Sequence, residues 1–231
     1  MHADQAVFTS LSRRGRSGYH VVARSPGVTE AEASALASWS PSHGSLIVDV
    51  ENAVSVNFHP LPGGRYALSR TCEGPPEYSG RGGRQLYTHA LVLDEAALRA
   101  ASCQAVAIYR AAMALGAFVY RADPPALLDP LELPRSFARP ATAAWDRRAA
   151  ALGLPPLDAL RDDLIGGRSL RPGHDGDRLA FVECLLGPLA PDESLAVSFA
   201  TSLLPSAARP CRLAVVGDAV AGDQPRATRS R

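Results

Sequence analysis

Residues 55–94 read SVNFHPLPGGRYALSRTCEGPPEYSGRGGRQLYTHALVLD, and this stretch decides the fold. It contains three runs in which apolar and polar residues alternate, separated by two connections rich in glycine and proline. A period of two places successive side chains on opposite faces of a β-strand. The connections at Pro60–Gly64 and Cys72–Gly83 are too short for a crossover helix, and their glycines suit tight reversals. We therefore predict a three-stranded antiparallel meander over residues 54–93.

More strands and two helices are expected on either side of this meander. An acidic first turn after Thr29 favours a helix that begins there, because carboxylates complement the helix dipole at its N-terminus. Apolar residues at three-and-four spacing predict a second helix directly after the meander. The expected elements are strands at Gln5–Ser10, Gly18–Ser25, Leu46–Val50 and Phe118–Arg121, and helices at Thr29–Trp39 and Glu95–Leu115.

The second half of the chain is predicted to be richer in helix. Residues 123–140 hold five prolines in eighteen positions and show little periodicity, which is typical of a connection between two parts of a protein. The pattern beyond it predicts helices at Thr142–Leu152, Leu157–Ile165 and Asp177–Leu186, and strands at Leu195–Ala200 and Arg212–Val216. Two strands are too few for a stable sheet of their own, so we expect this part to pack against the N-terminal half.

These elements indicate an α+β fold, with a largely antiparallel sheet packed by helices and followed by a smaller helix-rich α+β part. A chain of 231 residues is long enough for one large domain or two small ones. We predict an N-terminal α+β domain at residues 1–122, a Pro-rich connection at 123–140, a helix-rich α+β region at 141–217 and a disordered tail at 218–231.

Composition places the chain among folded proteins and argues against several classes of function. Hydrophobic residues make up 46% and charged residues 20%, and the formal net charge is only +1. So small a charge gives no general attraction to nucleic acid or to an anionic membrane. The N-terminus carries no signal-peptide pattern, and no apolar run reaches the roughly 18 residues of a membrane span. We expect a cytoplasmic protein with neither nucleic acid nor membrane as its partner.

No metal or cofactor is expected from the sequence. The four cysteines form no C-x-x-C pair, and no histidine lies at zinc-finger spacing from them. The segment His174–Asp177 carries residues that can ligate a cation, but helix capping by aspartate explains it more simply. The cluster Arg13–Arg16 lacks interleaved aromatic residues, so a solvated loop explains it better than a contact with nucleic acid.

His59 and His89 are the candidate catalytic residues of a hydrolase. Both are predicted on strands of one sheet, so one of them would act as a general base, with Ser69 or Cys103 as the nucleophile. No G-x-S-x-G, H-E-x-x-H or catalytic cysteine signature flanks either histidine. We therefore favour hydrogen-bonded strand histidines over a catalytic pair, and a protein without enzymatic activity.

The loop Ser79–Arg84, with the sequence SGRGGR, is the candidate binding site. Its glycines free backbone N–H groups, and its two arginines add guanidinium donors for a phosphate, a carboxylate or an acidic protein surface. It is not a Walker A loop, because the Lys-Ser/Thr ending is absent and a strand follows. In the alternative interpretation the loop is solvated and its arginines pair with Glu73 and Glu77. The predicted partner- or anion-binding residues are Gly80, Arg81, Gly82, Gly83 and Arg84.

Several segments together resemble one protein family. They are Gln5–Phe8, Gly18–Tyr19, Ser25–Gly27, Phe58–Arg70, Gly80–Arg84 and Thr88–Val92. This set resembles the N-terminal domain, type 2, of bacterial GTPase-associated protein 1. Further on, Leu195–Thr201 and Arg209–Leu213 resemble the end of the middle region of that family.

The resemblance implies a component of multi-gene bacterial conflict or signalling systems that acts beside a partner GTPase. The leading hypothesis is an interaction or adaptor protein that docks on the GTPase or its assembly. The alternatives are a hydrolase that uses His59 and His89, and an anion- or nucleotide-sensing module centred on Arg81 and Arg84. The resemblance also implies a large C-terminal portion, which does not follow Val216 here, so a complete chain, a fragment and a short variant are all open.

Overall fold

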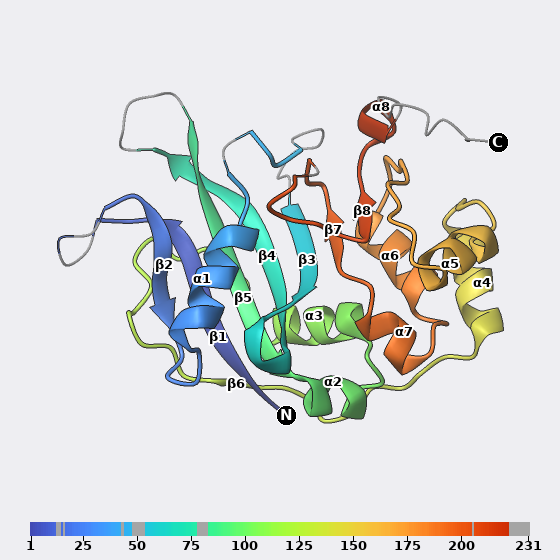
Figure 1. Cartoon of the computed structure of the whole chain (residues 1–231), viewed down its shortest axis with the longest axis horizontal. Helices are drawn as coiled ribbons and strands as arrows, with labels where there is room; N and C mark the ends of the chain where they lie inside the picture. The colour runs from blue at the N-terminus through green and yellow to red at the C-terminus, as the bar shows by residue number, and fades with distance from the viewer. Residues whose placement is uncertain are drawn as a thin grey trace.

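The computed structural model describes residues 1–12, 15, 17–42, 44–47, 54–77, 83–204 and 206–221. Within these residues the strands form one sheet in the order β2-β1-β5-β4-β3-β7-β8, with β6 paired to β1 outside that path (Figure 1). The strands are β1 (His2–Ser10), β2 (Tyr19–Arg24), β3 (Val54–Pro60), β4 (Arg65–Pro76), β5 (Arg84–Asp94), β6 (Leu131–Glu132), β7 (Phe199–Thr201) and β8 (Leu213–Val215). Among these strands only β7 and β8 pair in parallel, which confirms the α+β fold with a largely antiparallel sheet.

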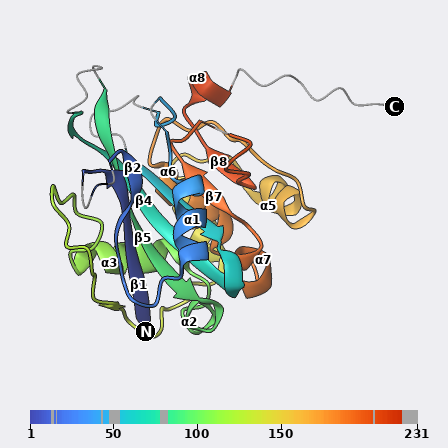
Figure 2. The same ribbon diagram turned by 60° about the vertical axis from the view of Figure 1, so that its left-hand side comes forward.

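Helices cover the two faces of the sheet unequally (Figure 2). One face, called the α1 face, carries α1 (Glu30–Trp39), which buries Leu36 in a small cluster with Ala67 and Val92. The opposite face, called the α3 face, packs the larger core. Helices of that larger core are α2 (Glu95–Ala100), α3 (Ala105–Ala114), α4 (Thr142–Ala151), α5 (Asp158–Ile165), α6 (Arg178–Leu186) and α7 (Pro191–Leu195). Among the residues described, no helix has both the length and the apolar character needed to span a membrane.

The predicted meander is confirmed as β3, β4 and β5. Phe58 lies opposite Leu68, which in turn lies opposite Leu91, and all three are buried in the core of the α3 face. The turn between β3 and β4 is the short 3-10 helix η1 (Pro62–Gly64), in which Gly63 has a φ of 80°. A positive φ is strained for residues with a Cβ, so glycine fits this position. The alternation read from the sequence therefore sets both the pairing and the faces of the central strands.

The C-terminal strands complete the same sheet. β7 pairs with β3, with Phe199 opposite Phe58, and β8 pairs with β7. Phe199 and Leu213 are fully buried in the core of the α3 face, beside Phe58 and the apolar residues of α6. The expected packing of the second half of the chain on the first is confirmed. The division at residues 122 and 140 stays a prediction, and the short helix α8 (Asp218–Ala221) occupies the first four residues of the predicted tail.

The start of α1 is built as the sequence indicates. Thr29 is the N-cap, and its hydroxyl accepts a hydrogen bond from the Glu32 backbone N–H at 3.2 Å. The Glu32 carboxylate accepts from the Thr29 N–H at 2.8 Å, so the two residues form a reciprocal capping box. Glu32 is buried, and its carboxylate also forms an ion pair with Arg65.

The single helix predicted at Glu95–Leu115 is wrong, because the chain breaks it into α2 and α3. Between them Ser102 and Cys103 adopt positive φ angles of 54° and 53°. The Cys103 N–H donates to the Leu98 carbonyl at 2.7 Å, which closes the end of α2. Neither glycine nor proline stands at this break, so the sequence carries no local signal for it.

One further predicted strand is wrong, and another is wrong in part. Residues 118–121 form no strand, and Phe118 has a left-handed φ of 63° with its N–H bonded to a side chain. Leu195 is the last residue of α7, and β7 begins only at Phe199. The period of two in residues 195–200 arises because Leu195, Val197 and Phe199 all reach the same core from the end of a helix and the start of a strand.

Candidate functional site

His59 lies buried between β3 and α1, with 1% of its surface exposed. Its ring stacks on that of Trp39, with centroids 4.1 Å apart and planes 3° apart. Its Nδ1 lies 3.1 Å from the Pro60 carbonyl oxygen. Burial, only partly opposed by that backbone contact, lowers the pKa of His59 to about 4. His59 is therefore a neutral packing residue of the α1 face at pH 7.

His89 lies on β5 and has both ring nitrogens engaged in hydrogen bonds. Its Nδ1 accepts from the Phe118 backbone N–H at 3.0 Å, so Nε2 carries the proton and donates to Gln5 Oε1 at 2.9 Å. Burial, and secondarily the nearby positive charge of Arg121, lower the pKa of His89 to about 4. These bonds explain the positive φ of Phe118, because they fix the chain after α3 against the sheet.

The structure does not bring His59 and His89 together. His59 lies opposite Ala67 on the α1 face, whereas His89 lies opposite Arg70 on the α3 face. Ser69 shares with His59 a cavity of only about 10 Å³, which is too small for a substrate. Cys103 is buried on the other face, and that burial raises the pKa of its thiol. Neither Ser69 nor Cys103 is therefore placed with one of these histidines in an accessible cavity of the described structure.

The β4–β5 hairpin carries the predicted binding loop at its end. Gly80, Arg81 and Gly82 lie outside the described residues, whereas Gly83 and Arg84 lie within them. The Arg84 side chain is 55% exposed, and its Nε lies 3.2 Å from Glu73 Oε2 on the neighbouring strand. Figure 1 shows the hairpin reaching past the end of β3. Arg84 thus stands at a protruding edge and has one of the two acidic neighbours that the sequence suggested.

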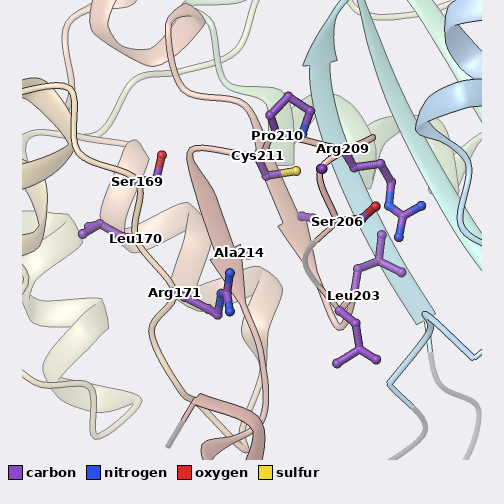
Figure 3. A pocket seen from close by; sticks show the side chains of 12 residues that line it. Ser169, Leu170, Arg171, Leu203, Ser206, Arg209, Pro210, Cys211 and Ala214 are labelled. Atoms are coloured by element: carbon purple, nitrogen blue, oxygen red, sulfur yellow. The ribbon is translucent and has the colours of Figure 1, made fainter. Parts of the chain in front are cut away.

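A cavity of about 540 Å³ opens at the β7–β8 end of the sheet, where sequence reasoning predicted no site. Its floor includes Ala200 and Ala214, which lie opposite each other in the parallel pair of strands. Figure 3 shows Arg171 on one side of these strands and Arg209 on the other. The remaining lining residues include Ser169, Leu170, Leu203, Leu204, Ser206, Ala207, Pro210 and Cys211.

The two arginines of this cavity differ in exposure. Arg209 is 9% exposed, and its guanidinium donates one long hydrogen bond, 3.5 Å, to the Ser40 carbonyl after α1. Arg171 is exposed. Neither has a carboxylate within ion-pair distance in the part of the chain that the structure describes. Burial lowers the pKa of Arg209, because its charge is desolvated without a matching anion.

No signal in the sequence points to this cavity. Arg209 and Arg171 are 38 positions apart in the chain and belong to no motif. The cavity exists because β8 adds to β7 in parallel and places two alanines side by side, which is a property of the pairing. The resemblance drawn for Arg209–Leu213 comes nearest to it, but assigns no role to the arginine.

The described residues contain no group of three or more His, Cys, Asp and Glu side chains arranged to hold a metal ion. Asp177, in the segment weighed as a cation site, is the N-cap of α6 and accepts from the Ala180 N–H at 2.9 Å. Its carboxylate therefore has the local capping role that the sequence favoured.

Comparison with known proteins gives one match, and it covers the meander and its neighbours. No curated protein and no solved structure matches the chain. The match to a family ends at residue 132, so the resemblance of the later segments to a middle region stays a prediction. Residues 2–132, more than half of the chain, match the family described as GTPase-associated protein 1, N-terminal domain type 2, and the chain belongs to that family.

Proposed function

We propose that this protein is an interaction component that docks on a GTPase or on the assembly around it. The observation that carries this proposal is the family membership of residues 2–132, since the family is described by its association with a GTPase. The setting we propose is a bacterial conflict or signalling system in the cytoplasm. The protein acts there by binding rather than by catalysis, which agrees with two buried histidines on opposite faces of the sheet.

The docking surface in this proposal is the end of the β4–β5 hairpin. Arg84 contacts Glu73 through its Nε, and a guanidinium has five N–H donors, so further donors remain for an acidic partner. Arg81 and the glycines Gly80, Gly82 and Gly83 complete the proposed surface. Glycine-rich chain is costly to order, and contacts of the two arginines with an acidic partner would offset that cost. A contact of this kind at the rim of an interface weakens as salt increases.

The test is a pull-down with a candidate partner GTPase, at low and at moderate salt. The variant is Arg81→Ala/Arg84→Ala, and the control is Arg135→Ala/Arg147→Ala, which removes the same charge at two exposed positions elsewhere. We expect the hairpin variant to lose binding, most clearly at low salt, and the control to bind as wild type does. Equal binding by both variants with unchanged melting temperatures would remove the hairpin from the interface.

Two alternatives remain as hypotheses beside this proposal. A hydrolase using His59 and His89 needs a cavity that both rings reach, and they lie on opposite faces of the sheet. An anion- or nucleotide-sensing role for Arg81 and Arg84 would use the same hairpin with a small ligand in place of a protein. A hydrolytic activity that the hairpin variant abolished would replace the adaptor proposal with the enzyme hypothesis.

A further inference from the structure

We propose that the β7–β8 cavity binds a small organic oxyanion, with Arg209 and Arg171 as its charged contacts. The ligand class is a small molecule carrying phosphate or carboxylate groups. This site is separate from the proposed GTPase-docking surface, because it lies at the β7–β8 edge of the sheet, whereas the hairpin joins the central strands β4 and β5 (Figure 1).

The floor of the cavity includes two small side chains at the β7–β8 edge of the sheet. Phe199 and Leu213 point into the core of the α3 face, so their neighbours Ala200 and Ala214 point to the α1 face. α1 packs over Ala67 and Val92, which belong to the central strands, and not over this end. A methyl side chain at each of two paired positions leaves the hollow above them open.

The unusual feature of the cavity wall is a largely buried arginine whose guanidinium has few partners among the described residues. Arg209 is 9% exposed, and within the described part of the chain its one hydrogen bond is the 3.5 Å contact with the Ser40 carbonyl. A guanidinium carries five N–H donors, and its charge is costly to bury without a counter-charge. The described residues that line the cavity include no acidic residue. An anion in the cavity would supply both the missing acceptors and the missing charge.

Arg171 offers a second guanidinium to the cavity from the other side of strands β7 and β8 (Figure 3). Its side chain is exposed and lines the cavity from the segment that runs along β8, together with Ser169. Ser206 lines the side of Arg209. Two arginines and two hydroxyl groups without a carboxylate form a set of donors suited to oxyanions.

The volume of the cavity indicates the size of the ligand. About 540 Å³ falls in the range of roughly 300–1,000 Å³ that small-molecule sites occupy. Arg171 and Arg209 lie on opposite sides of the strands that form the floor (Figure 3). A ligand with oxyanion groups at two points fits this arrangement, whether these are phosphates or carboxylates.

The competing explanation is structural. Arg209 lies by the carboxyl end of α1, where a positive charge is favourable to the helix dipole, and its bond to Ser40 would then be its whole role. That explanation assigns no function to Arg171. The two explanations are therefore separated by a variant of Arg171, which is exposed and safe to replace.

Isothermal titration calorimetry at low ionic strength tests the proposal, with pyrophosphate and citrate as probes for the two oxyanion sources. The variants are Arg171→Ala and Arg209→Met, with Arg147→Ala as an exposed control of equal charge. We expect saturable binding of at least one probe, weakened roughly fivefold or more by Arg171→Ala and unaffected by the control. The probe that binds with the higher affinity identifies whether the natural ligand carries phosphate or carboxylate groups.

Two results would overturn the proposal. The first is the absence of saturable binding for both probes to the wild-type protein. The second is equal affinity in wild type, Arg171→Ala and Arg147→Ala, which would show attraction by general charge. The Arg171 comparison is decisive even if Arg209→Met does not fold. No GTPase is present in this experiment, so its failure is distinct from failure of the proposed docking role.

Discussion

Arg65 and Arg209 are both largely buried arginines of the same sheet, and their surroundings differ completely. Arg65, at the start of β4, lies within 2.6 Å of Asp4, 3.3 Å of Glu32 and 2.8 Å of Asp94. Arg209, at the β7–β8 cavity, has the Ser40 carbonyl and no carboxylate in the described part of the chain. Burial alone would lower the pKa of both groups, but the three carboxylates reverse that effect for Arg65 and raise its pKa.

The difference separates an arginine that stabilises the fold from one that is available to a ligand. Arg65 links β1, α1 and the end of β5, and the Glu32 it faces has a side chain only 3% exposed. Removing it would leave a buried carboxylate uncompensated. Arg209 pairs with no carboxylate in the described part of the chain, so its removal leaves no acidic side chain there without a counter-charge. The same substitution at the two positions should therefore have very different effects.

The largest expected effect is that of Arg65→Met. This variant keeps much of the apolar stem but leaves Glu32 buried without a counter-charge, so we expect a loss of about 3–5 kcal/mol in the free energy of unfolding. Urea unfolding followed by circular dichroism measures it. A loss below about 1 kcal/mol would show that the Arg65 cluster is no more important to stability than an exposed ion pair.

The buried histidines His59 and His89 differ from both arginines. Their lowered pKa leaves them neutral in the folded protein at pH 7, so they need no counter-charge. Below pH 6.5 the unfolded chain protonates His59 and His89, while the folded protein does so only near their lowered pKa of about 4. The unfolded state then binds more protons, so stability falls as pH drops from about 6.5 to 4. We expect each histidine to contribute about 2–3 kcal/mol to this loss.

The measurement is urea unfolding at pH 7 and at pH 4.5 for wild type and His89→Gln. The exposed histidine variant His2→Gln is the control, with a side chain 75% exposed in the wild type. His89→Gln should be less stable at pH 7 but should lose less stability on acidification than wild type does. An unchanged pH dependence in that variant would contradict the assignment of a neutral His89 in the folded protein.

Arg209→Met is the counterpart of the first variant, and its expected effect on stability is small. The substitution removes one long hydrogen bond and also relieves the desolvation of an unmatched charge, so the two changes oppose each other. We expect the free energy of unfolding to stay within about 1 kcal/mol of wild type. A loss close to that of Arg65→Met would make Arg209 a structural residue and weaken the comparison.

The smallest expected effect is that of Arg84→Ala. The pair with Glu73 lies at the surface, with the Arg84 side chain 55% exposed. Exposed pairs of this kind contribute little, so we expect a change below about 0.5 kcal/mol in unfolding experiments. Thermal unfolding in low and in high salt checks this value. A clearly larger loss would mean that Arg84 holds the hairpin together and is not free for a partner.

The sequence predicts the centre of the fold well and its connections less well. The alternation around Phe58, Leu68 and Leu91 is a local property of each strand, so the meander and its faces follow from it. The break at Ser102–Cys103 depends on tertiary packing and a backbone bond to Leu98, and no residue type marks it. The pairing of β7 with β3 joins Phe58 and Phe199, which are 141 positions apart. The local pattern predicts only that the C-terminal strands need partners, and does not predict which strand they pair with.

The candidate sites were predictable only where they lie on local sequence features. Gly83 and Arg84 could be named because glycine and arginine gather in one connection. The opposite faces of His59 and His89 depend on the register of three strands, as seen in their partners Ala67 and Arg70. The cavity with Arg209 depends on which strand adds to β7. A local sequence pattern does not show which distant strands will pair, so it predicts neither of these arrangements.

The central claim is that this member of the family docks on a GTPase through the end of its β4–β5 hairpin. Hydrogen–deuterium exchange of the protein alone and bound to a candidate partner GTPase tests it most directly. The account predicts new protection in peptides covering residues 72–77 and 83–88, with exchange at the β7–β8 cavity unchanged. Protection confined to other segments, with the hairpin exchanging as in the free protein, would contradict it.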